Sequence, residues 1–135
     1  MKHFEEVLHT ADWSFRAFGR DLSELFEIAA RALFSLQGAI PRETAVGVKR
    51  DVQVAGIDYE SLLVNWLNEL LFMQEQHREV YVHFTISVSS PTELSAQIIG
   101  KPREKMDKII KAVTYHNLKI EQIKDVWQVL VVVDV

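Results

Sequence analysis

Apolar residues along this chain follow two different periods, and the helical period occupies two segments. In the first, apolar residues recur every three or four positions from Leu22 to Leu36. Asp21 is placed as the N-cap, with Glu24 in the capping-box position, and Gly38 suits the C-terminal stop. In the second, Asp58 can cap a helix with a wide apolar stripe, made of Tyr59, Leu62, Leu63, Trp66, Leu67, Leu70 and Leu71. These patterns predict two amphipathic helices.

A period of two predicts the strands. The clearest one has apolar residues at every second position, namely Val80, Val82, Phe84, Ile86 and Val88. Further strands are predicted at 3–8, 13–18, 46–54, 94–98, 112–120 and 126–133, with residues 100–106 as a polar connection. The last strand is apolar on both faces over residues 129–133, which is typical of a central strand.

Strands joined by tight turns, together with two amphipathic helices, predict an α+β fold. The 135 residues fit one domain of ordinary size. We therefore expect one compact domain over residues 1–135, with a mixed or antiparallel sheet and both helices packed on one face. The apolar stripes then form the core, so Trp66 is expected to be a packing residue rather than a platform for a nucleic-acid base.

Composition and missing motifs exclude several classes of site and argue against several kinds of partner. The chain has no Cys, which excludes disulfides, thiolate zinc sites and cysteine nucleophiles. It also lacks G-x-S-x-G, both glycine-rich phosphate loops and H-E-x-x-H, so the motifs give no support to nucleophilic hydrolysis, to nucleotide chemistry by this chain alone or to a metalloprotease. A net charge of −4 with scattered Lys and Arg argues against tight direct binding of nucleic acid. With no apolar run long enough to span a bilayer and no secretory signal, we expect a cytoplasmic protein without a membrane partner.

Carboxylates at the ends of apolar segments are the candidate chemistry. Asp134 closes a run of valines, and the α-carboxylate of Val135 adds a second negative group, while Asp12 lies in an early turn. An ionised carboxylate resists burial unless it is paired or bound to metal. If the early turn and the last strand meet, Asp12, Asp134 and Val135 supply the oxygen ligands that calcium and magnesium prefer. Alone, Asp12 can be a turn residue and Asp134 an exposed strand end.

Three other side chains leave alternatives open. Zinc would need His9 and His116 as ligands, but we expect each to hold a turn by hydrogen bonding. Lys111 lies within an apolar stretch. It either extends its ammonium to solvent from a strand edge or supplies a countercharge to the acids or to a partner's phosphate.

Five segments, in order and over essentially the full length, resemble the archease family. They are His9-Thr10-Ala11-Asp12, residues 26–34 (F-E-I-A-A-R-A-L-F), residues 62–71 (L-L-V-N-W-L-N-E-L-L), residues 111–116 (K-A-V-T-Y-H) and Asp134-Val135. Each motif alone is weak, but five in register are specific. Trp13-Ser14 and the connection from 100 to 110 depart from the family pattern.

The resemblance implies a non-catalytic accessory protein with an Hsp33-like fold. Archeases assist the RtcB-type tRNA-splicing RNA ligase by promoting its guanylylation and its multiple turnover. Carried over by motif, Asp12, Lys111 and Asp134 serve ligase activation, and Asp12, Asp134 and Val135 bind a divalent cation. Calcium is the expected cation, with magnesium or manganese as alternatives. Two other functions stay open: a chaperone-like modulator of RNA- or DNA-processing proteins, which needs an exposed apolar patch, and a metal-dependent hydrolase with His116 as base.

Overall fold

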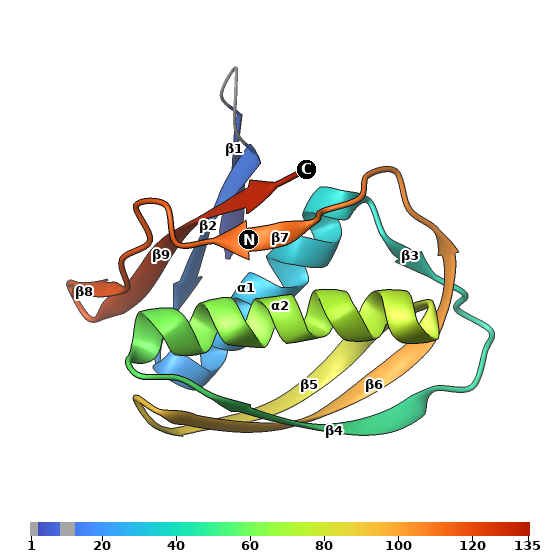
Figure 1. Ribbon diagram of the computed structural model, residues 1–135, viewed down its shortest axis with the longest axis horizontal. Helices are drawn as coiled ribbons and strands as arrows, with labels where there is room; N and C mark the ends of the chain where they lie inside the picture. The colour runs from blue at the N-terminus through green and yellow to red at the C-terminus, as the bar shows by residue number, and fades with distance from the viewer. Residues whose placement is uncertain (1–2, 9–12) are drawn as a thin grey trace.

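A computed structural model describes residues 3–8 and 13–135 of the chain. Over these residues the strands form two antiparallel sheets, and two long helices lie between the sheets (Figure 1). The predicted α+β class is confirmed. The expected single sheet with both helices on one face is replaced by an arrangement in which each helix contacts both sheets.

The first sheet brings the two ends of the chain together. Its order is β1 (Phe4–Leu8), β2 (Trp13–Gly19), β9 (Val126–Asp134) and β7 (Ala112–Thr114), and β8 (Glu121–Ile123) also pairs with β9. Strand β9 is therefore central, as its two apolar faces predicted. Residues 112–120 were predicted as one strand, but the strand ends at Thr114 because a turn follows at once.

The second sheet is built around β6 (Glu93–Lys105). It pairs with β4 (Val48–Ala55), with β5 (Glu79–Ser90) and, at its C-terminal end, with the short β3 (Ile40–Pro41). The predicted strands near 80–88 and 94–98 are confirmed. The predicted polar connection at 100–106 is wrong, because β6 continues through Lys105 to pair with β3.

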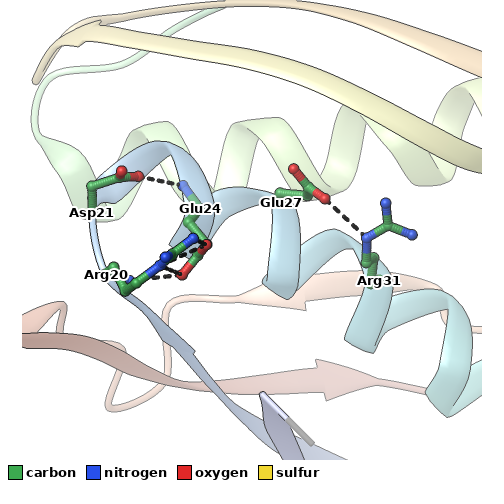
Figure 2. A network of polar contacts seen from close by, with 5 residues as sticks. All are labelled: Arg20, Asp21, Glu24, Glu27 and Arg31. Carbon is green, nitrogen blue, oxygen red and sulfur yellow. Dashed lines mark hydrogen bonds and ion pairs between the residues drawn. The ribbon is translucent and has the colours of Figure 1, made fainter. Parts of the chain in front are cut away.

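Helix α1 (Leu22–Gln37) begins and ends at the predicted residues. Figure 2 shows its beginning, with Asp21 and Glu24 joined by a hydrogen bond. The Asp21 carboxylate accepts a hydrogen bond from the Glu24 N–H at 2.8 Å, and Gly38 ends the helix with φ 65°. The Glu24 carboxylate does not close the expected capping box. It accepts instead from the backbone and the guanidinium of Arg20, which lies one residue before the cap and lowers the pKa of Glu24.

Helix α2 (Tyr59–His77) has the capping box that α1 lacks. The Asp58 carboxylate accepts from the Ser61 N–H at 2.7 Å, and the Ser61 hydroxyl accepts from the Asp58 N–H at 3.1 Å. The predicted stripe of α2 is core from Leu62 to Leu71, whereas Tyr59 at its start is half-buried. Trp66 is fully buried, its indole N–H donates to the Phe26 carbonyl at 3.1 Å, and its ring meets Phe84 edge-on. Its predicted packing role is confirmed.

Candidate functional site

The candidate site lies where β7 begins and β9 ends. Ala112 pairs with Asp134, and the Lys111 N–H donates to the Asp134 carbonyl at 2.7 Å. The lysine and the acid predicted from the sequence are thus neighbours across two strands, although they are 23 positions apart in the chain by their numbers. We call Lys111, Asp134 and Val135 the tip. Figure 1 shows the C-terminus beside the start of β7.

The three residues of the tip are open to solvent. Lys111 and Asp134 are exposed, and Val135 keeps 42% of its surface accessible. Neither the Lys111 ammonium nor the Asp134 carboxylate forms a hydrogen bond or ion pair with another residue in the part of the chain that the structure describes. Asp134 borders a surface hollow of about 240 Å³ that is also lined by Thr114, His116, Val132 and Val133. Both charges are therefore available to a ligand or a partner.

Asp12 and His9, two of the residues singled out in the sequence, lie outside the described residues. The expectation that the carboxylates of Asp12 and Asp134 share one cation therefore stays a prediction. Within residues 3–8 and 13–135, no group of three or more His, Cys, Asp or Glu side chains could hold a metal ion.

His116 forms part of a turn, as expected. The Leu118 N–H donates to the Tyr115 carbonyl at 3.0 Å, and Asn117 between them has φ 52°. The His116 N–H donates to the Thr114 hydroxyl at 3.3 Å, and its ring Nε2 lies 3.2 Å from the Asn117 amide. The expected turn role of His116 is confirmed.

The segment leading into β7 is held by contacts that the sequence analysis did not identify. The Asp107 and Lys108 N–H groups both donate to the Gln37 carbonyl at the end of α1. The Lys108 ammonium lies 3.3 Å from the centre of the Trp13 ring, a cation–π contact. Trp13 of β2 and Lys108 therefore join the segment to the first sheet.

Asn68 of α2 holds the other side of β7. Its Oδ1 accepts from the Val113 N–H at 2.8 Å, and its Nδ2 donates to the Val113 carbonyl at 3.2 Å. The signal that could have revealed Asn68 is an amide placed between two leucines of the buried stripe, where a polar side chain needs a partner.

The least exposed ion pair among the described residues lies in the other sheet. Arg50 of β4 donates two hydrogen bonds to the Glu79 carboxylate of β5, at 2.7 and 2.9 Å. These bonds hold the pKa of Glu79 below its usual value, and burial raises the pKa of the nearby Tyr81 hydroxyl. Because Glu79 is buried and fully paired with Arg50, we interpret this cluster as structural.

Among the described residues, neither helix is long and apolar enough to cross a membrane.

Comparison with known proteins places the chain in a family. The model of the archease protein family matches residues 4–135. "Protein archease" of Methanosarcina acetivorans is 37% identical over 99% of this chain and 97% of its own, and that of Pyrococcus abyssi is 36% identical over the whole of both.

Solved structures agree with the fold. The solution structure of a Methanobacterium thermoautotrophicum protein superposes with a TM-score of 0.75, at 29% identity over the whole of both chains. A Thermotoga maritima protein, described as an archease and a possible chaperone, matches with a TM-score of 0.70 at 23% identity, over 96% of this chain and 94% of its own. With the family model and the relatives agreeing over essentially the full length, the chain belongs to the archease family.

Proposed function

We propose that this protein is a non-catalytic activator of an RtcB-type RNA ligase in the cytoplasm. It promotes guanylylation of the ligase and multiple turnover, and the ligase rather than this chain binds the RNA. The observation that carries the proposal is the hydrogen bond from Lys111 to Asp134, which sets an exposed lysine beside an exposed acid. The five archease segments of the sequence include both residues.

We further propose that the tip binds a divalent cation through Asp12, Asp134 and the carboxylate of Val135. Strand register supports this ligand set. Trp13, which follows Asp12 in the sequence, pairs with Val133, which precedes Asp134. Oxygen ligands suit calcium, with magnesium or manganese as alternatives.

The chemistry of the tip suits a partner that holds a nucleotide. An exposed ammonium can bind a phosphate group as a point charge, and an acid with one bound cation can do so through the metal. If the tip binds the guanylylation-competent conformation of the ligase better than its other conformations, it raises the population of that conformation.

Ligation under multiple-turnover conditions tests the proposal. The cognate ligase is assayed alone, with the wild-type protein, and with Lys111→Ala. Lys119→Ala is the matched control, because Lys119 is an exposed lysine whose weak ion pair with Glu121 spans 3.6 Å. We expect stimulation by wild type and Lys119→Ala and its loss with folded Lys111→Ala. Wild-type stimulation by Lys111→Ala would show that the lysine is only a surface residue.

A chaperone-like function is the second candidate, and exposed apolar residues in the tip and near Lys111 in the sequence favour it. Ile109, Tyr115 and Val135 keep 62%, 57% and 42% of their surfaces exposed. Such residues can bind unfolded segments of a client, although they can equally form the rim of a contact with the ligase. Suppression of the aggregation of an unrelated unfolded protein would support the chaperone, and stimulation limited to the ligase would support the activator.

A further inference from the structure

The amide side chain of Asn68 joins helix α2 to strand β7 of the first sheet. Strand β7 has only three residues, and it pairs with β9 along one edge. On Val113, the middle residue, both backbone polar groups bond to the Asn68 amide, at 2.8 and 3.2 Å. Asn68 therefore takes the place that the peptide group of a neighbouring strand would occupy.

The position of Asn68 is fixed by the core. The residues on either side of it in the apolar stripe, Leu67 and Leu70, are fully buried, as is Trp66. The backbone of α2 at this point therefore cannot shift without disturbing the packing of the core. Asn68 itself is half-buried, so its hydrogen bonds to Val113 are partly shielded from water.

Lys111 of the tip directly precedes the strand that Asn68 holds. Lys111 lies two positions before Val113, and its N–H bonds to the Asp134 carbonyl. A three-residue strand has few backbone hydrogen bonds of its own, so it depends on what lies at both edges.

We propose that Asn68 is a positioning residue: it holds β7 against β9 so that Lys111 stays beside Asp134. The inference rests on the proposed role of the tip in ligase activation. It goes beyond that proposal because it assigns a role to Asn68 of α2. This residue acts only by holding β7 in place.

The test compares three variants of α2. Asn68→Asp keeps the shape and one acceptor but turns an oxygen toward the Val113 carbonyl, and Asn68→Leu removes both bonds. Asn65→Leu is the control, since Asn65 is an exposed amide on the same helix that donates one bond, to the Ala55 carbonyl at 2.8 Å, in the other sheet. Hydrogen exchange of the Val113 amide and stimulation of ligase turnover are measured on samples shown to be folded.

We expect faster exchange at Val113 and a loss of stimulation of about tenfold or more for both Asn68 variants, as for other small misplacements of reacting groups. Asn65→Leu should match wild type in both measurements. Lys111→Ala should keep wild-type exchange at Val113 although it loses stimulation, because the Asn68 amide bonds to the Val113 backbone without the lysine side chain. A general loss of stability would instead speed exchange throughout both sheets and not only around Val113.

Unchanged exchange at Val113, wild-type stimulation by Asn68→Leu, or equally faster exchange throughout both sheets would each overturn the inference. Failure of the proposed function has a different signature. If the wild-type protein does not stimulate the ligase while the Asn68 variants still exchange faster at Val113, the ligase role falls and the holding of β7 by Asn68 stands.

Discussion

Trp66 and Asp134 mark the two extremes among single residues in this protein. Trp66 is fully buried and uses its one polar atom within the core, whereas Asp134 is exposed at a strand end. Burial fixes what each residue can contribute. A buried side chain stabilises the fold through packing, while an exposed carboxylate without a partner in the described chain adds little to stability and is free to bind.

For Trp66→Ala we expect a loss of about 3–5 kcal/mol in the free energy of unfolding, because the deletion leaves a large cavity between α1 and the second sheet. Urea unfolding measures it. Trp66→Phe keeps most of the volume and should lose less. A loss below about 1 kcal/mol for Trp66→Ala would mean that the core collapses around the site or that the indole is not packed as described.

For Asp134→Ala we expect an intact fold and, in chelator, a thermal midpoint equal to or slightly above that of wild type. In the proposed ligand set, Asp134 would face the carboxylates of Asp12 and Val135, so the variant would remove a repulsive negative group when no cation is bound. Added calcium should raise the midpoint of wild type and of Asp51→Ala, an exposed acid of β4, but not that of Asp134→Ala. A fall of more than about 5 °C in chelator, on the order of 1 kcal/mol, would mark Asp134 as structural.

Residue roles were predictable from the sequence where their partners are local. Both helix caps and Gly38 follow from spacings of a few residues, and each was found. Asn68 bonds to a strand 45 positions further along, and Lys108 lies on the ring of Trp13. Such contacts depend on which distant segments lie side by side in the fold. The spacing of residues along the sequence does not carry that information.

At the scale of elements, β6 shows where hydrophobic periodicity stops being informative. Its apolar alternation ends near Ile98, yet the strand continues for seven more residues, to Lys105. The polar part is held by long-range contacts. Arg103 bonds to Glu75 at 2.8 Å, and the Lys101 ammonium donates to the Glu43 carbonyl at 3.0 Å. A strand that is polar on both faces gives no period-two signal, so it was predicted as a connection.

The pair of Arg50 and Glu79 joins β4 to β5 across β6, and we expect it to make stability depend on pH. The pKa of Glu79 is lowered in the folded protein from its usual 4.5, chiefly by the hydrogen bond from Arg50. The contribution is therefore complete above pH 4.5 and is lost as the pH falls through the lowered folded value. At pH 7, Glu79→Gln should cost about 1.5–3 kcal/mol, as for hydrogen bonds to charged groups.

Urea unfolding of wild type and Glu79→Gln between pH 7 and strongly acidic pH measures this dependence. The difference between the two proteins should shrink toward zero at the acidic end. Glu93→Gln, at an exposed acid of β6, serves as the control and should track wild type throughout. A difference that stays constant over the whole range would show that the Glu79 charge is not what stabilises the pair.

At the scale of the whole molecule, the arrangement of helices between sheets depends on pairings between distant segments. Strand β2 pairs with β9, the last strand, and this pairing sets the first residue of β2, Trp13, beside Val133 near the end of β9. The sequence shows which face of each strand is apolar but not which strand lies beside it. The class, the helices and the central position of β9 could be predicted for that reason, whereas the division into two sheets could not.

The two helices are joined at their C-terminal ends by a buried amide pair. Gln37 of α1 and Gln74 of α2 are each about 1% exposed, and each donates its side-chain N–H to the other's carbonyl oxygen, at 3.0 and 2.8 Å. The backbone carbonyl of Gln37 also accepts from Asp107 and Lys108 in the segment that leads to the tip. Gln37 therefore connects α1 to α2 through its side chain, and to the segment that leads to the candidate site through its backbone carbonyl.

We expect the pair to behave as a unit in a double-mutant cycle. Gln74→Met keeps the volume but leaves the Gln37 amide buried without its partner, so it should cost about 1–3 kcal/mol of unfolding free energy. The same holds for Gln37→Met. The double variant buries two thioether side chains of similar shape and should be more stable than the sum of the single losses predicts, because no unpaired amide remains. Urea unfolding of the four proteins at pH 7 gives the coupling energy. Additive losses would mean that water or another group satisfies each amide in the single variants, and that the helices are joined by apolar packing alone.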